Sequence, residues 1–276
     1  MPSPLLNVMI KAAKKASTRL RRDFNELENL QVSTKGPANF VSSADIRTQE
    51  IIFNELLKAK PDWSFTMEEK ASVQSKTSNN RFIIDPIDGT QNYAWGIPCF
   101  SIVIALAKDG EVVAGVNFDP INREMFHAAR GKGAFLNDKK IQVSEISNFE
   151  DVILVTDPAY GPVAGTTDTL QMLRKIWPSL KTARMIGSSA LSISYVAAGR
   201  MDIFVHHRLQ PYDQAAGIIL MEEAGGLITD RQGNRAQLYS DGLIASSSII
   251  HQQFMERTKH LQWRKPSSRS VNPRER

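Results

Sequence analysis

Apolar residues recur at helical spacing near the start of the chain, at Leu5, Met9, Ala12, Ala16 and Leu20. Lysine and arginine residues fall between them, which predicts an amphipathic surface helix over residues 5–24. The segment has no continuous apolar core, so we expect no export signal here. A second helical pattern covers residues 48–58 and ends before Pro61.

Short segments rich in valine, isoleucine or phenylalanine follow in the middle of the chain, at residues 101–107, 111–117, 123–129 and 134–136. Asp-Gly, Asp-Pro and Gly-Lys-Gly turns separate them, which is typical of an antiparallel meander. After about residue 151 the pattern changes to alternating strands and helices. We expect strands at 152–156, 184–186, 202–205 and 243–246, and helices at 167–176, 190–198, 213–223 and 249–260.

The two patterns follow each other without a long linker or an internal repeat, so we predict one compact domain over residues 1–262. Residues 1–150, approximately, form its antiparallel-sheet half, and residues 151–262 form its α/β half. The chain has 276 residues, of which 42% are hydrophobic, so a sizeable core is possible. No run of about 20 apolar residues occurs, which predicts a soluble protein without a membrane span.

Residues 263–276 are rich in serine, proline and arginine, and we predict a flexible basic tail there. The formal net charge of the chain is +5, and the last thirteen residues, with five basic residues and one glutamate, contribute +4 of it. The tail is therefore either a contact for RNA, DNA or an acidic partner, or a solubilising segment without a partner. The single cysteine, Cys99, excludes an internal disulfide and a thiolate zinc cluster, and fits a reducing cytoplasm.

The segment 82–90 combines two acids with a break in the strand pattern. Residues 82–84 form a short apolar run that ends at Asp85, and Pro86 interrupts it. Asp88-Gly89-Thr90 can begin a helix, whose free N–H groups attract phosphate. Because carboxylates suit hard cations such as Mg²⁺, the segment predicts a site for metal-assisted phosphate chemistry. The alternative interpretation is a capped turn between two core elements.

Two further acids fall at the ends of predicted elements. An apolar run that starts at Trp63 ends at Glu68, and Asp213 lies in the first turn of a predicted helix. If the first run is a strand parallel to the one before Asp85, its end brings Glu68 and Asp85 together. Asp213 taken alone is more often a helix-start acid than a ligand. Considered with Glu68, Asp85 and Asp88, however, it favours a shared metal site.

Other ligand sets and phosphate-binding loops are absent from the sequence. Histidine and cysteine residues form no cluster with metal-ligand spacing, and no Gly-x-x-x-x-Gly-Lys-Ser/Thr loop occurs. These absences disfavour a zinc site and a nucleotide-driven motor.

The chain resembles the inositol monophosphatase family, and within it the bacterial branch of extragenic suppressor proteins, in the order and spacing of several motifs between Lys11 and His260. These motifs are Met67-Glu-Glu69, Asp85-Pro-Ile-Asp-Gly-Thr-Gln-Asn92, Ala128-Ala-Arg-Gly131, Gly187-Ser-Ser-Ala-Leu191, Tyr212-Asp-Gln-Ala-Ala-Gly217 and Glu223-Ala-Gly-Gly226. The resemblance implies the αβαβα sandwich of the inositol monophosphatase and fructose-1,6-bisphosphatase type. It also implies a homodimer that hydrolyses a phosphate monoester with two or three Mg²⁺ ions per active site and is inhibited by lithium.

The resemblance implies a role for each motif residue. The first Mg²⁺ would be bound by Glu68, Asp85 and the backbone carbonyl of Ile87, and the second by Asp85, Asp88 and Asp213. Glu68 would also contact a third ion through water.

The attacking water and the phosphate would be bound by neighbouring residues. Thr90, paired with Asp45, would orient the water and help to deprotonate it. The N–H groups of Gly89 and Thr90 would bind the phosphate, and Asp88 would also contact the substrate.

Three positions bear on substrate choice. His206 stands seven residues before Asp213, where the resemblance leads one to expect a glutamate, and Arg208 follows closely. These residues either belong to a polar surface loop or contact the substrate. In the second case His206 would donate to a substrate hydroxyl, and Arg208 would bind a second anionic group. Ser189 would add a hydrogen bond to the substrate.

The sequence leaves the function open between two classes. The first is a Mg²⁺-dependent phosphomonoesterase for inositol monophosphate or a related small polyol or sugar phosphate. Fructose 1,6-bisphosphate, histidinol phosphate and 3′-phosphonucleotides are alternative substrates, because substrate choice depends on a few loop contacts around one metal centre. The second is a binding or regulatory protein of transcription or RNA processing, which the basic tail motivates.

Overall fold

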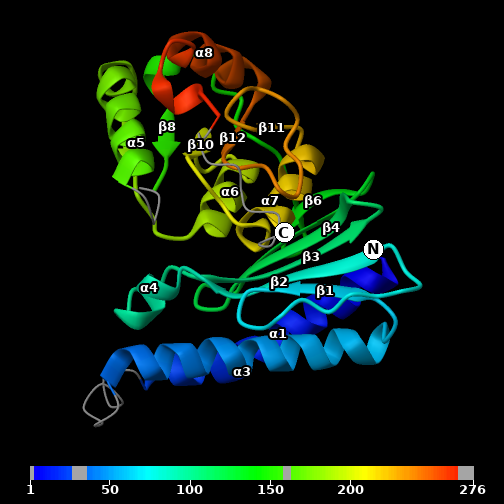
Figure 1. Cartoon of the computed structure of the whole chain (residues 1–276). Coiled ribbons are helices and arrows are strands. Elements are labelled where there is room, and N and C mark those ends of the chain that lie inside the picture. The colour runs from blue at the N-terminus through cyan, green and yellow to red at the C-terminus, as the bar shows by residue number, and fades with distance from the viewer. Residues whose placement is uncertain (1–2, 27–35, 158–162, 267–276) are drawn as a thin grey trace.

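The computed structural model describes residues 3–26, 36–157 and 163–266. Two β-sheets alternate with three layers of helices, so the described chain forms an αβαβα sandwich (Figure 1). This architecture confirms the predicted fold class.

The first sheet has seven strands in the order β1-β2-β3-β4-β5-β6-β7, and all neighbours are antiparallel except β1 and β2, which are parallel. Its strands are β1 (Ser64–Met67), β2 (Asn80–Asp88), β3 (Ser101–Lys108), β4 (Glu111–Asp119), β5 (Glu124–Ala129), β6 (Gly133–Leu136) and β7 (Lys139–Ile141). The predicted meander is confirmed, and β7 extends it by one strand.

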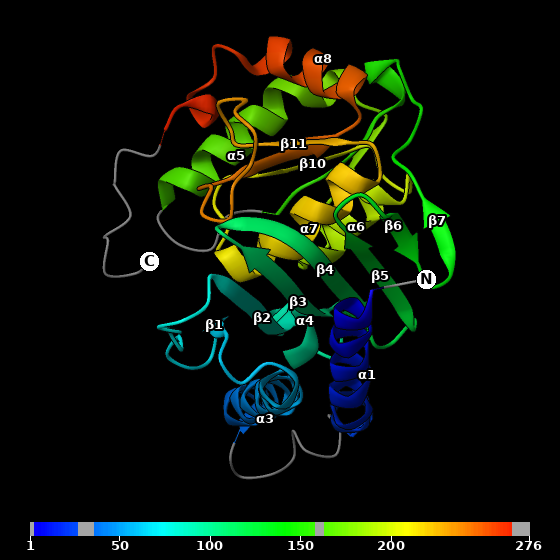
Figure 2. The same ribbon diagram turned by 90° about the vertical axis from the view of Figure 1, so that its right-hand side faces the viewer.

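Both faces of the first sheet are covered by helices. α1 (Pro4–Asn25) and α3 (Gly36–Ala59) cover one face, and Figure 2 shows them beneath the strands. α6 (Ser189–Ala197) and α7 (Pro211–Glu223) cover the other. Alternate side chains of β3 therefore enter two different cores: Ile102, Ile104 and Leu106 on the α1/α3 side, and Val103, Ala105 and Ala107 on the α6/α7 side. Burial on both faces explains why such strands read as continuous apolar runs.

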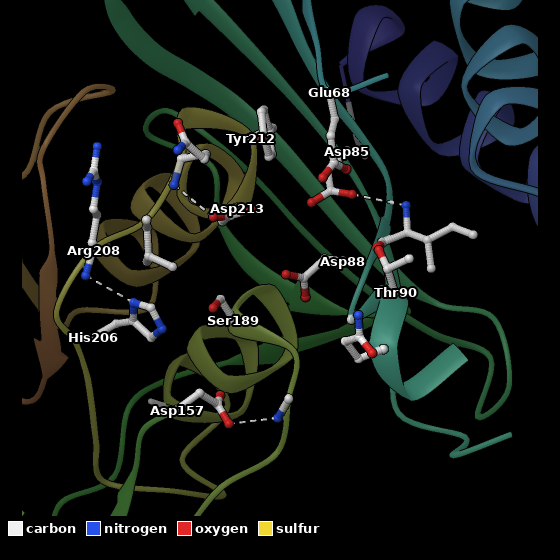
Figure 3. Close-up of a pocket in the computed structure, with 16 residues that line it drawn as sticks. Glu68, Asp85, Asp88, Thr90, Asp157, Ser189, His206, Arg208, Tyr212 and Asp213 are labelled. Atoms are coloured by element: carbon white, nitrogen blue, oxygen red, sulfur yellow. Dashed lines mark hydrogen bonds between the residues drawn. The ribbon is translucent and has the colours of Figure 1, made fainter. Parts of the chain in front are cut away.

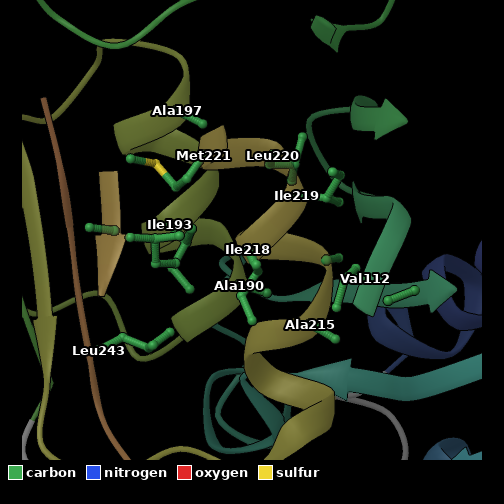
Figure 4. Close-up of a cluster of buried hydrophobic side chains, with 14 of the residues drawn as sticks. Val112, Ala190, Ile193, Ala197, Ala215, Ile218, Ile219, Leu220, Met221 and Leu243 are labelled. Atoms are coloured by element: carbon green, nitrogen blue, oxygen red, sulfur yellow. The ribbon is translucent and has the colours of Figure 1, made fainter. Parts of the chain in front are cut away.

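Small residues allow α6, α7 and the first sheet to pack closely. A Cβ atom on Gly115 of β4 would lie 2.8 Å from the Cα atom of Ala216 in α7, and one on Gly217 would lie 2.8 Å from a methyl carbon of Ile193 in α6. Interiors are close-packed, so neither position has room for a side chain. Figure 4 shows the apolar side chains of this core. This packing fixes the direction of α7 and hence the position of its first turn.

The second sheet has five strands in the order β11-β12-β10-β8-β9. Its strands are β8 (Ile153–Val155), β9 (Thr182–Arg184), β10 (Ile203–His206), β11 (Leu227–Thr229) and β12 (Leu243–Ser246). α5 (Val163–Ile176) and α8 (Ser248–Thr258) cover its outer face through a separate core. The short elements are α4 (Thr90–Ala94), η1 (Phe149–Asp151), η2 (Trp177–Ser179) and η3 (Gln262–Arg264).

The structure corrects two predicted elements and adds one further strand that was not predicted. The helix expected at 48–58 is the longer α3, which begins at Gly36. The strand expected at 184–186 is β9, which ends at Arg184 and leaves the next residues to a loop. β11 had no counterpart among the predicted strands, since three residues are too few to give a pattern. No described helix is long and apolar enough to cross a membrane.

The packed body extends beyond the predicted domain boundary at residue 262. Trp263 is 1% exposed and packs edge-on against Phe254. The buried guanidinium of Arg231 donates hydrogen bonds to the backbone carbonyls of Trp263 and Lys265. The first residues of the predicted flexible tail are therefore packed, because the tryptophan supplies apolar area that a Ser/Pro/Arg-rich segment lacks. The rest of the predicted tail, residues 267–276, lies outside the described residues.

Candidate functional site

Parallel pairing of β1 and β2 brings the first two acids together. Met67, the last residue of β1, pairs with Ile84 of β2, so Glu68 and Asp85 follow side by side. Ile83 belongs to the core on the α6/α7 side, and Asp85, two residues later, faces the same way. Each of these two carboxyl groups shifts the pKa of the other. The predicted convergence of these two acids is confirmed.

A β-bulge turns Asp88 to the same face as Asp85. Three residues separate these acids along the chain, which in a regular strand would place them on opposite faces. The register with β3 shifts between them, from Asp85 opposite Val103 to Asp88 opposite Ser101, so β2 holds one extra residue. The N–H of Ile87, inside the bulge, donates to Asp85 Oδ1 at 3.0 Å. The bulge therefore aims both carboxylates at the α6/α7 layer.

The starts of α6 and α7 complete the group. Asp88 Oδ2 accepts hydrogen bonds from the Ser188 hydroxyl and, at 3.0 Å, from the N–H of Ala190 at the start of α6. Asp213 lies in the first turn of α7, where its Oδ2 accepts from the N–H of Gln210 at 2.8 Å. Carboxylate oxygens of Asp85, Asp88 and Asp213 all lie within 4.8 Å of one another. With Glu68, these residues are called the carboxylate cluster below.

Burial and mutual repulsion oppose the charged form of every member of the carboxylate cluster. Desolvation of the carboxyl group is the largest cause in each case, although Glu68 as a residue is exposed; it raises the pKa of Glu68 to about 7 and that of Asp88 to about 6. The pKa values of Asp85 and Asp213 are raised well above the ordinary value, again by burial first and then by neighbouring carboxylates. Hydrogen bonds from α6 limit the rise at Asp88. The cluster therefore demands a compensating positive charge near neutral pH.

The residues present fit a hard divalent cation. Within residues 3–26, 36–157 and 163–266, no lysine, arginine or histidine forms an ion pair with the carboxylate cluster. Its donors are oxygen atoms, and Ile87 lines the same cavity. An oxygen-only donor set on one side of an open cavity suits Mg²⁺, which keeps water or substrate ligands.

A cavity of about 520 Å³ lies over the carboxylate cluster (Figure 3). Ten of the eleven predicted site residues line it: Glu68, Asp85, Ile87, Asp88, Gly89, Thr90, Ser189, His206, Arg208 and Asp213. The eleventh, Asp45, is not among the lining residues. Figure 3 shows Glu68 and Asp85 on one side of the cavity, His206 and Arg208 on the other, and Asp88 and Asp213 between them. The cavity is large enough for a small phosphate ester.

Thr90 and Asp45 are not hydrogen-bonded to each other in this structure. The Thr90 hydroxyl donates to the backbone carbonyl of Ile87 at 2.8 Å. Asp45 is a buried residue of α3, 2% exposed, and its Oδ1 has no hydrogen-bond partner among the described residues. Burial, followed by repulsion from Glu69 and Glu68, raises the pKa of Asp45 to about 8. The pairing of Thr90 with Asp45 is therefore not formed in this structure and stays a prediction.

Gly89 joins β2 to α4 in a conformation that favours glycine. Its φ is +97°, and a Cβ atom there would lie 3.1 Å from the carbonyl oxygens of both Cys99 and Gly187. Only glycine adopts this backbone without strain and fits between the two carbonyls. The backbone of Gly89 and Thr90 therefore reaches the cavity wall, in line with the segment that the sequence singled out.

His206 is a buried, neutral residue of the opposite wall. Burial lowers its pKa to about 4. Its Nδ1 accepts a hydrogen bond from the N–H of Arg208 at 3.3 Å, so the ring proton is on Nε2. The Arg208 guanidinium is partly exposed and lies 4.0 Å from Asp241. The wall opposite the cluster therefore offers a neutral donor and a cation.

Asp157 is a lining residue that the sequence analysis missed. It directly follows the strand predicted at 152–156 and observed as β8. An acid at the end of an apolar strand is the signal that identified Asp85, and it could have identified Asp157 too. Its Oδ1 accepts from the N–H of Gly187 at 2.9 Å. Gln91, Leu209 and Gln210 also line the cavity without a sequence signal.

Comparison with known proteins matches this chain to one protein family. A model of the inositol monophosphatase family matches residues 1–266. The inositol-1-monophosphatase of Mesorhizobium japonicum is 41% identical over 257 residues, 93% of this chain and 97% of that protein. The Nus factor SuhB of Pasteurella multocida is 32% identical over 255 residues, 92% and 96% of the two chains. The crystal structure of extragenic suppressor protein SuhB from Bartonella henselae matches with 44% identity and a TM-score of 0.86, covering 94% of this chain and 99% of that one.

Proposed function

Because the chain belongs to the inositol monophosphatase family, we propose that it is a Mg²⁺-dependent phosphomonoesterase for inositol monophosphate or a related small polyol or sugar phosphate. The observation that carries the proposal is the convergence of Asp85, Asp88 and Asp213, with carboxylate oxygens within 4.8 Å of one another, beneath a cavity of suitable size. Phosphoryl transfer depends on positioning and charge stabilisation, which an oxygen-rich cation site provides.

The residues that would bind two Mg²⁺ ions are Glu68, Asp85 and the Ile87 carbonyl for the first, and Asp85, Asp88 and Asp213 for the second. A third ion would contact Glu68 through water. When bound, Mg²⁺ lowers the pKa of water and offsets the negative charge of the phosphate.

Thr90 and Asp45 would act on the attacking water. The Thr90 hydroxyl now donates to Ile87, so its pairing with Asp45 requires the hydroxyl to turn when the carbonyl serves as a ligand. Asp45 Oδ1, which is buried and has no hydrogen-bond partner in the described part of the chain, is then available as the acceptor. The N–H groups of Gly89 and Thr90 would bind the phosphate.

The opposite wall would bind the alcohol part of the ester. We assign His206 as a donor to a substrate hydroxyl or ring oxygen, because its Nε2 carries the proton at neutral pH. Asp88 and Ser189 would contact the same part of the substrate. Arg208 would favour a second anionic group, as in fructose 1,6-bisphosphate or a 3′-phosphonucleotide, and histidinol phosphate is a further alternative.

The test of this function is phosphate release from inositol 1-phosphate, fructose 1,6-bisphosphate, histidinol phosphate and 3′-phosphoadenosine 5′-phosphate. Each ester is assayed with Mg²⁺ and with chelator. We expect Mg²⁺-dependent turnover of at least one ester, inhibited by lithium. A folded protein that hydrolyses none of them would contradict the proposal.

We further propose that the protein is a cytoplasmic homodimer that pairs through an apolar patch beside the cavity. The patch consists of Trp95, which is 76% exposed, with Ile97 and Met185. The Asn92 side chain holds its two segments together, donating to the carbonyls of Cys99 and Ile186 at 2.7 Å each. Large apolar residues exposed together mark interaction sites.

Replacing Trp95 with aspartate should convert the dimer to a monomer at micromolar concentration, because burial of an unpaired carboxylate opposes association. Light scattering measures the mass. The control is Trp177→Asp, at a 50% exposed tryptophan of η2, which should leave the dimer intact. A parent chain that is already monomeric would refute the proposed dimer.

A second candidate function is a regulatory contact with RNA or the transcription machinery. It is favoured by the relative named Nus factor SuhB and by the basic charge near the end of the chain. A chain that ends at Pro266 keeps the packed Trp263 and loses Arg269, Arg274 and Arg276.

We expect this truncation to keep its melting temperature and any phosphatase activity. Its affinity for single-stranded RNA should fall roughly 10-fold at low salt. The slope of log affinity against log salt concentration should decrease in magnitude by about 2, as the loss of three phosphate contacts predicts. If the RNA affinity and its salt dependence are unchanged, the basic residues after Pro266 do not bind RNA.

A further inference from the structure

One buried acid of the cavity lies outside the carboxylate cluster. Asp157 is 6% exposed, and only its Oδ1 is paired, to the N–H of Gly187. Its Oδ2 is buried and has no hydrogen-bond partner among residues 3–26, 36–157 and 163–266. Figure 3 shows Asp157 on the cavity side of its loop, below Ser189 and away from Glu68 and Asp85.

An unpaired carboxylate oxygen in a buried position is costly, so it calls for a donor. No described lysine, arginine or histidine forms an ion pair with Asp157. Burial raises its pKa to about 6, while backbone N–H groups of the 186–187 segment oppose the rise. The carboxylate is therefore held in place on one side and left without a partner on the other.

The loop that fixes Asp157 also fixes Asp88. Gly187 donates its N–H to Asp157, and the hydroxyl of the next residue, Ser188, donates to Asp88. The two acids consequently lie on one wall, with Asp88 in the carboxylate cluster and Asp157 further along. Because Asp157 lines the same cavity as the cluster, the alcohol part of an ester bound at the cluster has room beside Asp157.

This outer part of the cavity holds complementary hydrogen-bonding groups. Asp157 Oδ2 is an acceptor with no donor among the residues that the structure describes. His206 presents Nε2–H, because its Nδ1 already accepts from Arg208. A polyol hydroxyl can donate to the first and accept from the second, whereas an aryl or alkyl group can do neither.

We propose that Asp157 is a specificity-determining residue that accepts a hydrogen bond from a hydroxyl of the substrate's alcohol. The site accordingly selects polyol phosphates over phosphate esters without hydroxyl groups. The inference rests on the proposed phosphatase function. It concerns recognition of the leaving alcohol, and Asp157 takes no part in bond cleavage.

The test compares Asp157→Asn with the parent chain on two esters, inositol 1-phosphate and 4-nitrophenyl phosphate, both with Mg²⁺. Asparagine keeps an oxygen for Gly187 and presents an amide donor where the substrate hydroxyl needs an acceptor. We expect KM for inositol 1-phosphate to rise about 10- to 100-fold, the cost of losing a hydrogen bond to a charged group. Turnover of 4-nitrophenyl phosphate should change less than about 3-fold, because that ester has no hydroxyl for Asp157.

Two further variants separate recognition from folding. Asp157→Ser leaves room in the cavity and a hydroxyl for Gly187, and it should lose the polyol preference like Asp157→Asn. Asp119→Asn changes another fully buried acid, which pairs with the 121–122 turn and does not line the cavity. It should leave the ratio of kcat/KM for the two esters unchanged.

The possible outcomes separate the inferred role of Asp157 from the proposed phosphatase function on which that role rests. An equal loss on both esters, or no change on either, would overturn the role of Asp157 while the phosphatase function stands. A folded parent chain that hydrolyses neither of these esters, nor fructose 1,6-bisphosphate, histidinol phosphate or 3′-phosphoadenosine 5′-phosphate, would overturn both. A selective rise in KM for inositol 1-phosphate supports both.

Discussion

Replacing Asp88 with asparagine should lower kcat/KM roughly 1,000-fold, the loss seen when one preorganised charge-stabilising group is removed from an active site. This corresponds to about 4 kcal/mol of transition-state stabilisation. Asp88 is central because its carboxylate lies within 4.8 Å of those of both Asp85 and Asp213. The change removes a negative ligand for the proposed second Mg²⁺ and keeps the side-chain shape.

The same variant should remain folded, because asparagine still offers an oxygen to Ser188 and to the N–H of Ala190. Phosphate release measures the activity, and thermal melting measures the fold. Asp138→Asn, at an exposed acid between β6 and β7, serves as the control and should keep full activity. Near-parental turnover by Asp88→Asn would refute the assignment of the carboxylate cluster as the catalytic metal centre.

Removal of divalent cations should abolish activity and make the stability of the fold depend on pH. Without cations, the raised pKa values of the carboxylate cluster mean that the folded state binds more protons than the unfolded state between about pH 4 and pH 7. The free energy of unfolding must then fall as pH rises through this range. For Asp88, a rise in pKa from 3.8 to about 6 corresponds to about 3 kcal/mol.

With chelator present, the melting temperature should fall by roughly 6 °C between pH 5 and pH 8, as about one such contribution predicts for a chain of this size. Saturating Mg²⁺ should suppress most of this fall, because cations favour the charged carboxylates. Calorimetry at several pH values measures both curves. Identical pH dependence with and without Mg²⁺ would show that the cluster does not bind the ion.

Much of the site could be predicted because its acids fall at the ends of recognisable elements. Apolar runs ended at Glu68 and Asp85, and a helix start contained Asp213. Such signals are local, since they follow from strand and helix periodicity and from the preference for acids in the first helical turn. The same rule applied to the strand before Asp157 would have found that residue as well.

The sequence was less informative where distant segments fix a side chain. The hydroxyl of Thr90 has two possible acceptors, the Ile87 carbonyl and Asp45, and only the placement of α3 against α4 decides between them. The proton of His206 is on Nε2 because the backbone of Arg208 turns back on the ring. Neither arrangement follows from local propensity.

By itself, then, the sequence determined the layered fold, the acids of the carboxylate cluster and the glycine-containing turn at Gly89, because burial patterns and turn preferences act over a few residues. Only the tertiary structure decided how these acids meet. The bulge in β2 turned Asp88 to the face of Asp85, and close packing through Gly115 and Gly217 set α7 so that Asp213 joined them. The direction of a side chain and the convergence of segments more than 100 residues apart depend on packing of the whole core, which no local pattern encodes.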